Sequence, residues 1–424
     1  MANIGDMAHA PSAIGLLARH APDIDVVLWA RRISDTERRT LTSWYPGLRI
    51  VTGEVDELGR LSTPELQEEF DACDFLLHGS GRLLAGEPDV IRWRQLTGRP
   101  YGFLGISVDP LSPPVDGSHG WVGPLAEMDD IVRHLGDTHM TAQRRQLLSE
   151  ASFVYCRDSI SARYLAQHGL GPSEAVGFGP DAVFAFAPPG GVRPHLELQR
   201  SLSLGNEPYA CVVPRLRYTP YHRSLGLPVG QAEMLKDAIN AASSDREFDA
   251  LRAVIIDLVR ERGLRVLICP EMDYAGPLGA QIAAELPDDV RERVSALIDF
   301  WDPESATAIY ADAAVVVSME CHSPILAARV GVPALYVRQP TDTIKGAMWA
   351  DLGLSDRILE VEDATGDELV AATSRILDDL AGARADIVAK AAAASERLDT
   401  MAVFAGARIR EAATTRALVA EVRA

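Results

Sequence analysis

The sequence predicts an α/β protein built from two Rossmann-like domains that face each other across a cleft, with C-terminal helices. Short apolar runs rich in β-branched residues alternate with helical patterns along most of the 424 residues. A stretch dense in Pro and Gly, residues 188–206, interrupts this alternation once. Polar clusters directly follow several of the predicted strands, and ligands bind at the carboxyl ends of strands in parallel sheets.

The length of the chain favours two domains over one. We expect a Rossmann-like domain at residues 1–190, a linker at 191–206, a second Rossmann-like domain at 207–385 and helices packing across both domains at 386–424.

The composition of the chain argues against some classes of binding partner. The formal net charge of −19 argues against nucleic acid and against an anionic membrane surface. The 5 cysteines show no spacing typical of metal ligands, so we expect neither a disulfide framework nor structural zinc. No leader sequence and no apolar run of membrane-spanning length is present, which predicts a cytoplasmic protein without a transmembrane segment.

The first predicted domain opens with Asn3-Ile4-Gly5-Asp6, which we interpret as a turn before a helix at 12–19 and a strand at 26–29. Backbone donors at such a helix start can contact a ligand, although on its own the tetrapeptide is better explained as a plain turn. A doubly wound domain normally has a strand before this turn, so we expect the natural start to lie upstream.

Later strands of this domain, near residues 48–52, 75–78, 100–106 and 152–156, are followed by further candidates. Gly79, Ser80 and Gly81 form a turn that lets a ligand approach the backbone. Asp109 precedes a long loop holding Asp116, His119 and Trp121, interpreted as a lid facing the acceptor or as a disordered surface excursion.

Two more groups close this half of the chain. Arg157, Asp158 and Ser161 are either ligand contacts or a helix start with an ion pair. Asp181 is either structural or faces the cleft.

The second domain begins with an apolar strand that ends in Arg215 and Arg217, whose guanidinium groups suit a carboxylate or phosphate but could also form surface ion pairs. Helices are expected at 231–240 and 245–262. A strand at 264–269 precedes a loop with acidic residues, and another strand is expected at 294–300.

The most informative stretch is residues 313–354. Val315–Val317 predict a strand that ends in a turn carrying Glu320 and His322. Ser323 can cap the following helix, with Pro324 at its first position. A strand at 334–338 then leads to Arg338 and Lys345 on a loop.

The order of these motifs resembles the polysaccharide pyruvyl transferase family, from Asn3 to about Leu354. The matching residues are Asn3, Gly5, Asp6, the turn at 79–81, Arg157, Asp158, Ser161, Gly179, Pro180, Asp181, His322, Ser323, Gly331, Pro333 and Lys345. Glu320 departs from the pattern because the family has an arginine there.

The resemblance implies the GT-B arrangement and a transferase of polysaccharide biosynthesis. Such an enzyme moves the pyruvyl group of phosphoenolpyruvate to a glycan or sugar acceptor as a cyclic ketal, without a metal or other cofactor. The N-terminal domain would bind the acceptor and the C-terminal domain the donor.

The resemblance also implies roles for single residues. His322 would act as acid or base, since the family's histidine stands there. Glu320 departs from the family pattern, and from its own chemistry we expect it to orient His322 or to contact a sugar hydroxyl. The remaining candidates would bind substrate: Asn3, Asp6, Gly79, Ser80, Gly81 and Asp109 on the acceptor side, and Arg215, Arg217, Ser323, Arg338 and Lys345 on the donor side.

Two alternatives stay open. Glu320 would suit a nucleotide-sugar glycosyltransferase of the same fold, in which a carboxylate binds ribose hydroxyls. A non-catalytic glycan-binding or assembly protein would keep the fold without the donor site. A dinucleotide-dependent oxidoreductase is disfavoured because no GxGxxG motif occurs. The sequence specifies neither the acceptor sugar and linkage nor whether the chain forms a homo-oligomer.

Overall fold

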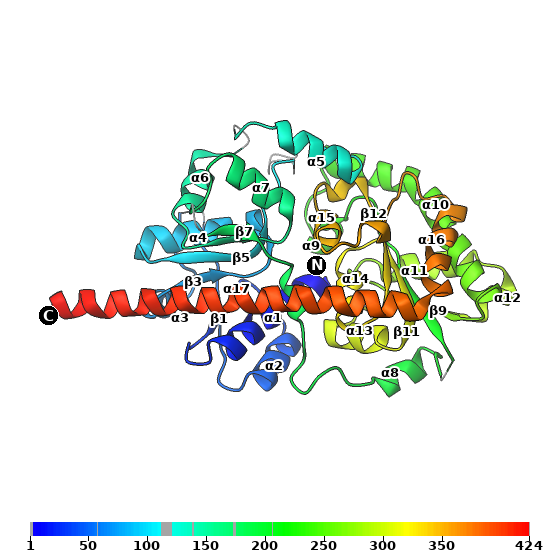
Figure 1. The fold of residues 1–424 in the computed structure, drawn as a ribbon, viewed down its shortest axis with the longest axis horizontal. Helices are drawn as coiled ribbons and strands as arrows, with labels where there is room; N and C mark the ends of the chain where they lie inside the picture. The colour runs from blue at the N-terminus through cyan, green and yellow to red at the C-terminus, as the bar shows by residue number, and fades with distance from the viewer. Residues whose placement is uncertain are drawn as a thin grey trace. The chain divides into compact units, whose positions relative to one another are not determined.

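The structure is a computed structural model that describes residues 3–56, 58–111, 121–137, 140–172, 175–205 and 207–423 (Figure 1). The described residues divide into two compact units. Unit 1 contains residues from 1–8, 111–132 and 191–393, and unit 2 contains residues from 9–110, 133–190 and 394–424. Three helices have residues in both units: α1 (Ile4–His20), α5 (Leu125–His134) and α17 (Leu380–Arg423).

Unit 1 is built on a six-stranded parallel sheet with the order β10-β9-β8-β11-β12-β13. In chain order this reads 3-2-1-4-5-6, the strand order of the doubly wound dinucleotide-binding fold. Its strands are β8 (Tyr209–Val213), β9 (Arg265–Ile268), β10 (Val294–Ala296), β11 (Ala313–Ser318), β12 (Ala334–Arg338) and β13 (Ile358–Glu360).

Helices precede, connect and follow the strands of unit 1. They are α8 (Leu196–Ser201), α9 (Tyr221–Leu225), α10 (Gln231–Arg260), α11 (Gly276–Ala284), α12 (Asp288–Arg291), α13 (Pro303–Tyr310), α14 (His322–Arg329), α15 (Ala347–Ala350) and α16 (Gly366–Asp378), with 3-10 turns at Pro340–Asp342 and Ser355–Arg357. Residues 231–260 form one helix, where the sequence suggested two.

The hydrophobic core of unit 1 lies between its sheet and the helices α10 and α16. Val254 and Leu258 of α10 pack in one cluster with Val212, Val266 and Val315 of the central strands. Each such side chain contributes about 1.5–3 kcal/mol when buried. The strand β8 is buried at every position, as expected for a central parallel strand covered on both faces.

Unit 2 also has a parallel sheet, with the order β3-β5-β6-β7 and β4 paired to β5. These strands are β3 (Leu76–His78), β4 (Gly81–Arg82), β5 (Tyr101–Ser107), β6 (Val154–Cys156) and β7 (Val176–Phe178). Two more strands, β1 (Val27–Ala30) and β2 (Arg49–Thr52), form a separate parallel pair. The helices are α2 (Asp35–Trp44), α3 (Pro64–Ala72), α4 (Leu83–Thr97), α6 (Ala142–Ser149) and α7 (Ser159–Gln167), with a 3-10 turn at Ala182–Ala185.

The 44-residue helix α17 has its first residues in unit 1 and its later residues in unit 2, and it forms hydrogen bonds within each unit. In unit 1, Arg384 donates to the carbonyl of Ala313 and Lys390 to that of Gly353. In unit 2, Arg397 donates to the carbonyl of Phe178. One continuous helix therefore replaces the several C-terminal helices expected from the sequence. In the described residues, none of the helices combines the length and apolar character that crossing a membrane requires.

The helix α1 begins at Ile4, earlier than expected. The Asn3 side chain accepts from the backbone N–H groups of Gly5, at 2.7 Å, and Asp6, at 3.3 Å. These contacts are those of a helix N-cap. The segment interpreted as a turn followed by a separate helix is therefore the first turn of α1 itself.

Candidate functional site

Each unit gathers buried polar side chains at the carboxyl ends of its parallel strands. In unit 1 they follow β8, β9 and β11, and in unit 2 they follow β3, β5, β6 and β7. Since parallel strands end at a common edge, the chain brings distant polar residues together at each edge.

In unit 1, the carboxylate of Glu271 caps the helix that carries His322. Glu271 follows β9 and is fully buried. Its Oε1 accepts from the backbone N–H of His322 at 3.3 Å, and its Oε2 accepts from that of Ser323 at 2.6 Å. The helix α14 begins at His322, so the expected cap at Ser323 is wrong. A negative side chain from the loop after β9 therefore supplies this cap, and its charge interacts favourably with the positive end of the helix dipole.

The same carboxylate contacts the His322 ring. Glu271 Oε1 lies 3.1 Å from His322 Nδ1, and Cys321 Sγ lies 3.6 Å from that nitrogen. Burial alone would lower the pKa of His322, but the Cys321 sulfur and the Glu271 carboxylate favour the charged ring, so this pKa lies well above its ordinary value. Burial would raise the pKa of Glu271, and His322 more than offsets this, leaving that pKa lowered. The geometry therefore favours a protonated imidazole beside an ionised carboxylate.

The first residues of the chain complete this arrangement. Asn3 Nδ2 is 3.4 Å from Glu271 Oε1, and the Ile4 N–H donates to the Glu271 carbonyl at 3.1 Å. A Cβ atom on Gly5 would lie 2.1 Å from the ring of His322. Only glycine therefore fits at position 5, because the imidazole occupies the space that any other side chain would need. The opening motif, at Asn3 to Gly5, therefore packs directly against His322 and Glu271, although it is more than 300 residues away from His322 in the chain.

Glu320 lies beside this pair but is directed toward Arg215. It is 2% exposed, and its Oε2 is 3.5 Å from Arg215 NH1. Burial raises its pKa to about 7, against the opposing effect of Arg215. Arg215 bonds more closely to Asp342 Oδ1, at 2.6 Å, and Tyr336 donates to Asp342 Oδ2, also at 2.6 Å. Glu320 is therefore the weaker of two acidic partners of one arginine.

Lys345 supplies a further positive charge at this edge. Burial would lower its pKa, but Cys321, Asp342 and Glu320 keep that pKa above its ordinary value. Within the described part of the chain, Lys345 makes no direct ion pair. Lys345 is a partly buried residue, and no carboxylate of the described residues neutralises its charge by direct contact.

The other two predicted arginines, Arg217 and Arg338, form ion pairs with carboxylates of unit 1. Arg217 bonds to Glu247 at 2.5 Å and to Glu362 at 2.6 Å. Arg338 is fully buried and bonds to Glu360 at 2.6 Å. A ligand that used either arginine would have to displace a carboxylate already in place.

Three side chains of unit 1 could hold a metal ion. Glu271, Cys321 and His322 each offer one ligand atom, and these atoms lie within 4.8 Å of one another. The same atoms already contact each other through the Glu271–His322 and Cys321–His322 interactions, so the arrangement does not require an ion to hold it together.

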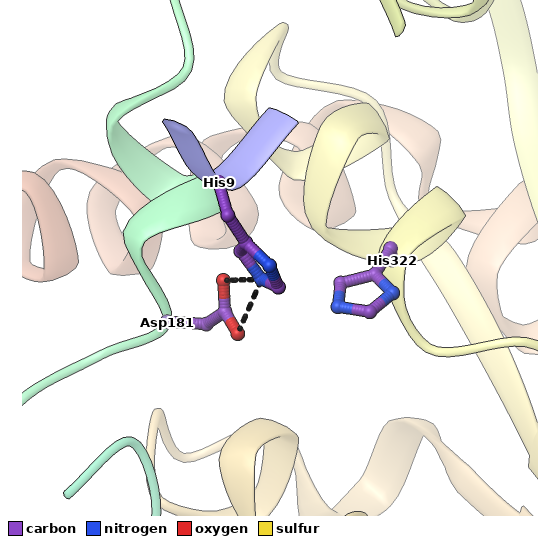
Figure 2. Close-up of side chains that lie close together, drawn as sticks. All are labelled: His9, Asp181 and His322. Atoms are coloured by element: carbon purple, nitrogen blue, oxygen red, sulfur yellow. Dashed lines mark hydrogen bonds and ion pairs between the residues drawn. The ribbon is translucent and has the colours of Figure 1, made fainter. Parts of the chain in front are cut away.

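In unit 2, a buried network joins the ends of β5, β6 and β7. Arg157 Nε donates to Ser107 Oγ at 2.9 Å, and Arg157 NH1 donates to Asp181 Oδ2 at 2.7 Å. His9 of α1 lies with its Nε2 3.2 Å from one oxygen of Asp181 and 3.3 Å from the other. Figure 2 draws both contacts as dashed lines. His322, which is also drawn there, belongs to unit 1. Asp181 thus lies between an arginine and a histidine.

The adjacent Asp158 has a structural role. It is the N-cap of α7, accepting from the Ser161 N–H at 2.6 Å, and Ser107 Oγ donates to it at 2.9 Å. Burial raises its pKa to about 6. The predicted helix start at Arg157, Asp158 and Ser161 is therefore present, and Arg157 pairs with Asp181 rather than with Asp158.

The predicted turn at Gly79, Ser80 and Gly81 lies at the same edge of unit 2. Ser80 Oγ donates to the Gly105 carbonyl at 3.0 Å and accepts from the Ala182 N–H at 3.3 Å. The hydroxyl therefore ties the turn to the end of β5 and to the residue after Asp181.

Other predicted residues lie outside these groups. Asp6 is exposed on the first turn of α1, and Asp109 is partly buried just after β5. Trp121 is 53% exposed, and its residue range groups with unit 1. Asp116 and His119 lie outside the described residues, so the lid assigned to that loop stays a prediction.

Sequence reasoning did not select Glu271 and His9. Glu271 was visible as an acid directly after a strand, but Asp273 shares that feature, and nothing local distinguishes the two. His9 was visible only as a histidine in a predicted turn region. Their partners are 51 and 172 residues away in the chain, respectively, and only the fold brings them into contact.

Comparison with known proteins places the chain in one family. The family described as polysaccharide pyruvyl transferase matches residues 3–339. None of the curated proteins compared with the sequence matches it.

Solved structures of low sequence identity share the fold. Anabaena HepE, in complex with UDP and glucose, superposes with a TM-score of 0.53 at 14% identity over 96% of both chains. MnaA of S. aureus, in a structure with UDP, gives 0.55 at 11% identity over 96% of this chain and 92% of that one. UDP-GlcNAc 2-epimerase from Neisseria meningitidis gives 0.54 at 10% identity over 94% and 96%. The fold is that of the GT-B glycosyltransferases and epimerases, as the sequence predicted.

Proposed function

Because the chain belongs to the polysaccharide pyruvyl transferase family, we propose that it transfers the pyruvyl group of phosphoenolpyruvate to a glycan or sugar acceptor, forming a cyclic ketal. The observation that carries this proposal is the buried Glu271–His322 pair at the carboxyl edge of the unit 1 sheet.

The reaction begins with a proton donor, for which His322 is suited. Forming the ketal converts the CH₂ group of the enol into a methyl group, so an acid must deliver a proton to that carbon. The raised pKa of His322 keeps the ring protonated near neutral pH, and Glu271 holds it in one orientation. Gly5 and Cys321 confine the ring further.

The donor also brings a carboxylate and a phosphate, which require positive charge. Lys345 supports this role because it is charged and has no direct ion pair in the described residues. Among the predicted arginines, Arg215 contacts the histidine-bearing turn through Glu320. Arg217 and Arg338 are better explained by their internal carboxylate partners.

Glu320, which stands where the family has arginine, is compatible with an anionic donor. A buried carboxylate with a pKa of about 7 carries only part of its charge at neutral pH. Arg215 and Lys345 oppose the charge that remains. Its 2% exposure and its direction toward Arg215 also give little support to a contact with ribose hydroxyls.

The test is phosphate release from phosphoenolpyruvate by the purified protein with a panel of glycan acceptors. We expect acceptor-dependent release that His322→Ala reduces by about 100-fold or more. His195→Ala is the matched control, because His195 is an exposed histidine of the same unit that contacts only the start of α8 in its hydrogen bonding. Control and wild type should have equal rates.

Two results would contradict the proposal. Absence of phosphate release with every acceptor, combined with turnover of a nucleotide sugar, would assign the chain to the glycosyltransferases. Biological activity that survives His322→Ala would point to a non-catalytic glycan-assembly protein.

A further inference from the structure

The loop after β12 contacts both of the positive charges that the proposed function assigns to the donor. In the parallel sheet of unit 1, β8 and β12 flank β11, so Arg215 and Asp342 follow the strands on either side of the one that leads to His322. Asp342 Oδ1 accepts from Arg215 NH1 at 2.6 Å. The Asp342 carbonyl accepts from the backbone N–H of Lys345 at 2.8 Å. Asp342 thus contacts one cationic residue through its side chain and the other through its backbone.

The carboxylate of Asp342 is itself held firmly. It is 4% exposed, and its Oδ2 accepts from the Tyr336 hydroxyl at 2.6 Å and from the Gln339 N–H at 3.3 Å. Burial would raise the pKa of Asp342, but Arg215 and Lys345 keep that pKa below its ordinary value. An ionised carboxylate with partners on both oxygens has one orientation, so it also fixes the guanidinium group that donates to it.

The backbone of this loop is strained directly before Lys345. Thr343 has φ 49° and ψ −113°, the angles of the first central residue of a type II′ turn, where glycine is favoured. Arg338 donates to the Thr343 carbonyl, and Thr341 Oγ1 donates to the Arg217 carbonyl at 2.6 Å. Strain that the surrounding contacts maintain in this way is common at ligand sites. The turn determines where the side chain of Lys345 begins.

Arg215 has a further hydrogen-bond donor. Its NH1 group serves both Asp342 and, at 3.5 Å, Glu320. Its Nε is buried and has no hydrogen-bond partner among the described residues. A buried donor without a partner costs free energy, and a ligand oxygen that accepts from it recovers that cost. The contact with Asp342 therefore holds one end of a guanidinium group whose Nε can serve an anion.

Building on the proposed function, we infer that Asp342 is a positioning residue of the donor site, which holds Arg215 and the turn before Lys345 in place for the carboxylate or phosphate of phosphoenolpyruvate. Charge and position give opposite expectations for this residue. If Asp342 acted only through its negative charge, removing that charge would strengthen the binding of an anion. If Asp342 positions Arg215, its removal lets the guanidinium group turn toward Glu320, the other partner, and the anion binds more weakly.

The experiment measures the KM for phosphoenolpyruvate in acceptor-dependent phosphate release by the wild type, Asp342→Asn and Asp289→Asn. Asparagine keeps the size of the side chain and removes its charge. We expect Asp342→Asn to raise this KM by about 10-fold or more, because a charge-assisted hydrogen bond to the donor is misaligned. The kcat at saturating donor should change much less, since the lost contact binds the donor before and during the reaction.

Asp289 is a matched control within the same unit. It is exposed and forms an ion pair with Arg260 at 2.8 Å, so Asp289→Asn also removes the acid of an Asp–Arg pair. Arg260 and Asp289 precede β9 and β10, respectively, and therefore lie toward the amino edge of the sheet, opposite the donor site. The control should have the KM and kcat of the wild type.

The outcomes separate the two proposals. Wild-type protein that releases no phosphate would overturn the proposed function itself. Wild-type release together with an unchanged or lower KM for Asp342→Asn would overturn the positioning role alone, and so would an equal rise in the KM for the acceptor, which indicates general damage. If Asp342→Asn does not fold, Tyr336→Phe removes only the hydroxyl that holds Oδ2 and should raise the same KM. An unchanged KM in that variant would also contradict the inference.

Discussion

Replacing Glu320 with glutamine should stabilise the protein at alkaline pH and change its stability much less near pH 5. Burial raises the pKa of Glu320 from its ordinary 4.5 to about 7, although Arg215 acts in the opposite direction. Between these two values the folded chain holds a proton that the unfolded chain has lost. Stability therefore falls as the pH rises through this window and stays low above it. The full difference is roughly 3 kcal/mol, taking about 1.4 kcal/mol per pH unit.

Glutamine cannot ionise, so the variant escapes this loss. The free energy of unfolding, measured by urea denaturation, should rise from wild type to Glu320→Gln by roughly 2 to 3 kcal/mol more at pH 8 than at pH 5. Arg215 keeps Asp342 as its main partner in the variant, at 2.6 Å. Glu292→Gln is the control, because Glu292 is an exposed glutamate of the same unit without an ion pair among the described residues.

The comparison has a clear refuting result. If the difference between Glu320→Gln and wild type is the same at both pH values, Glu320 does not titrate in this window. If the variant loses stability at pH 8, the carboxylate is ionised and contributes favourably through Arg215. Either result would remove the explanation for an acid at the position where the family has arginine.

Two further predictions concern His322. Gly5→Ala should abolish acceptor-dependent phosphate release nearly as fully as His322→Ala, because its Cβ would lie 2.1 Å from the imidazole. Gly177→Ala is the control, because its Cβ would make only an ordinary contact with Tyr155 at 3.8 Å, and this variant should retain activity. Equal activity of the two variants would contradict the close packing of Gly5 against His322. Glu271→Gln should move the alkaline limit of kcat to lower pH, because the ring loses the carboxylate that raises its pKa. A pH profile identical to that of the wild type would show that Glu271 does not tune His322.

Much of the fold follows from local sequence patterns. The apolar runs predict the strands β8, β9, β11 and β12, and helix signals such as Gly331 and Pro333 predict the end of α14 and the start of β12. The start of α1 was misplaced because an N-capping asparagine and a turn have the same local signature. The cap of α14 was misassigned because the true acceptor, Glu271, lies in the loop after β9, far away in the chain.

The site was less predictable for the same physical reason. His322 stands in a local motif and could be selected from sequence. Whether Arg217 and Arg338 are open to a ligand depends on Glu247 and Glu360, which approach them only in the folded chain. The requirement for glycine at position 5 likewise depends on a ring more than 300 residues away. The roles of Arg217, Arg338 and Gly5 thus depend on contacts with residues far away in the chain, and neither composition nor motif spacing predicts such contacts.

The most direct test of the central claim is the product of a reaction run in deuterated water with phosphoenolpyruvate and a glycan acceptor. Transfer by protonation of the enol carbon predicts a ketal whose methyl group carries one deuterium, detected by NMR and mass spectrometry. The product should be absent when His322→Ala replaces the wild type. A glycan that gains a sugar instead of a pyruvyl group, or a ketal formed equally well by His322→Ala, would contradict the account.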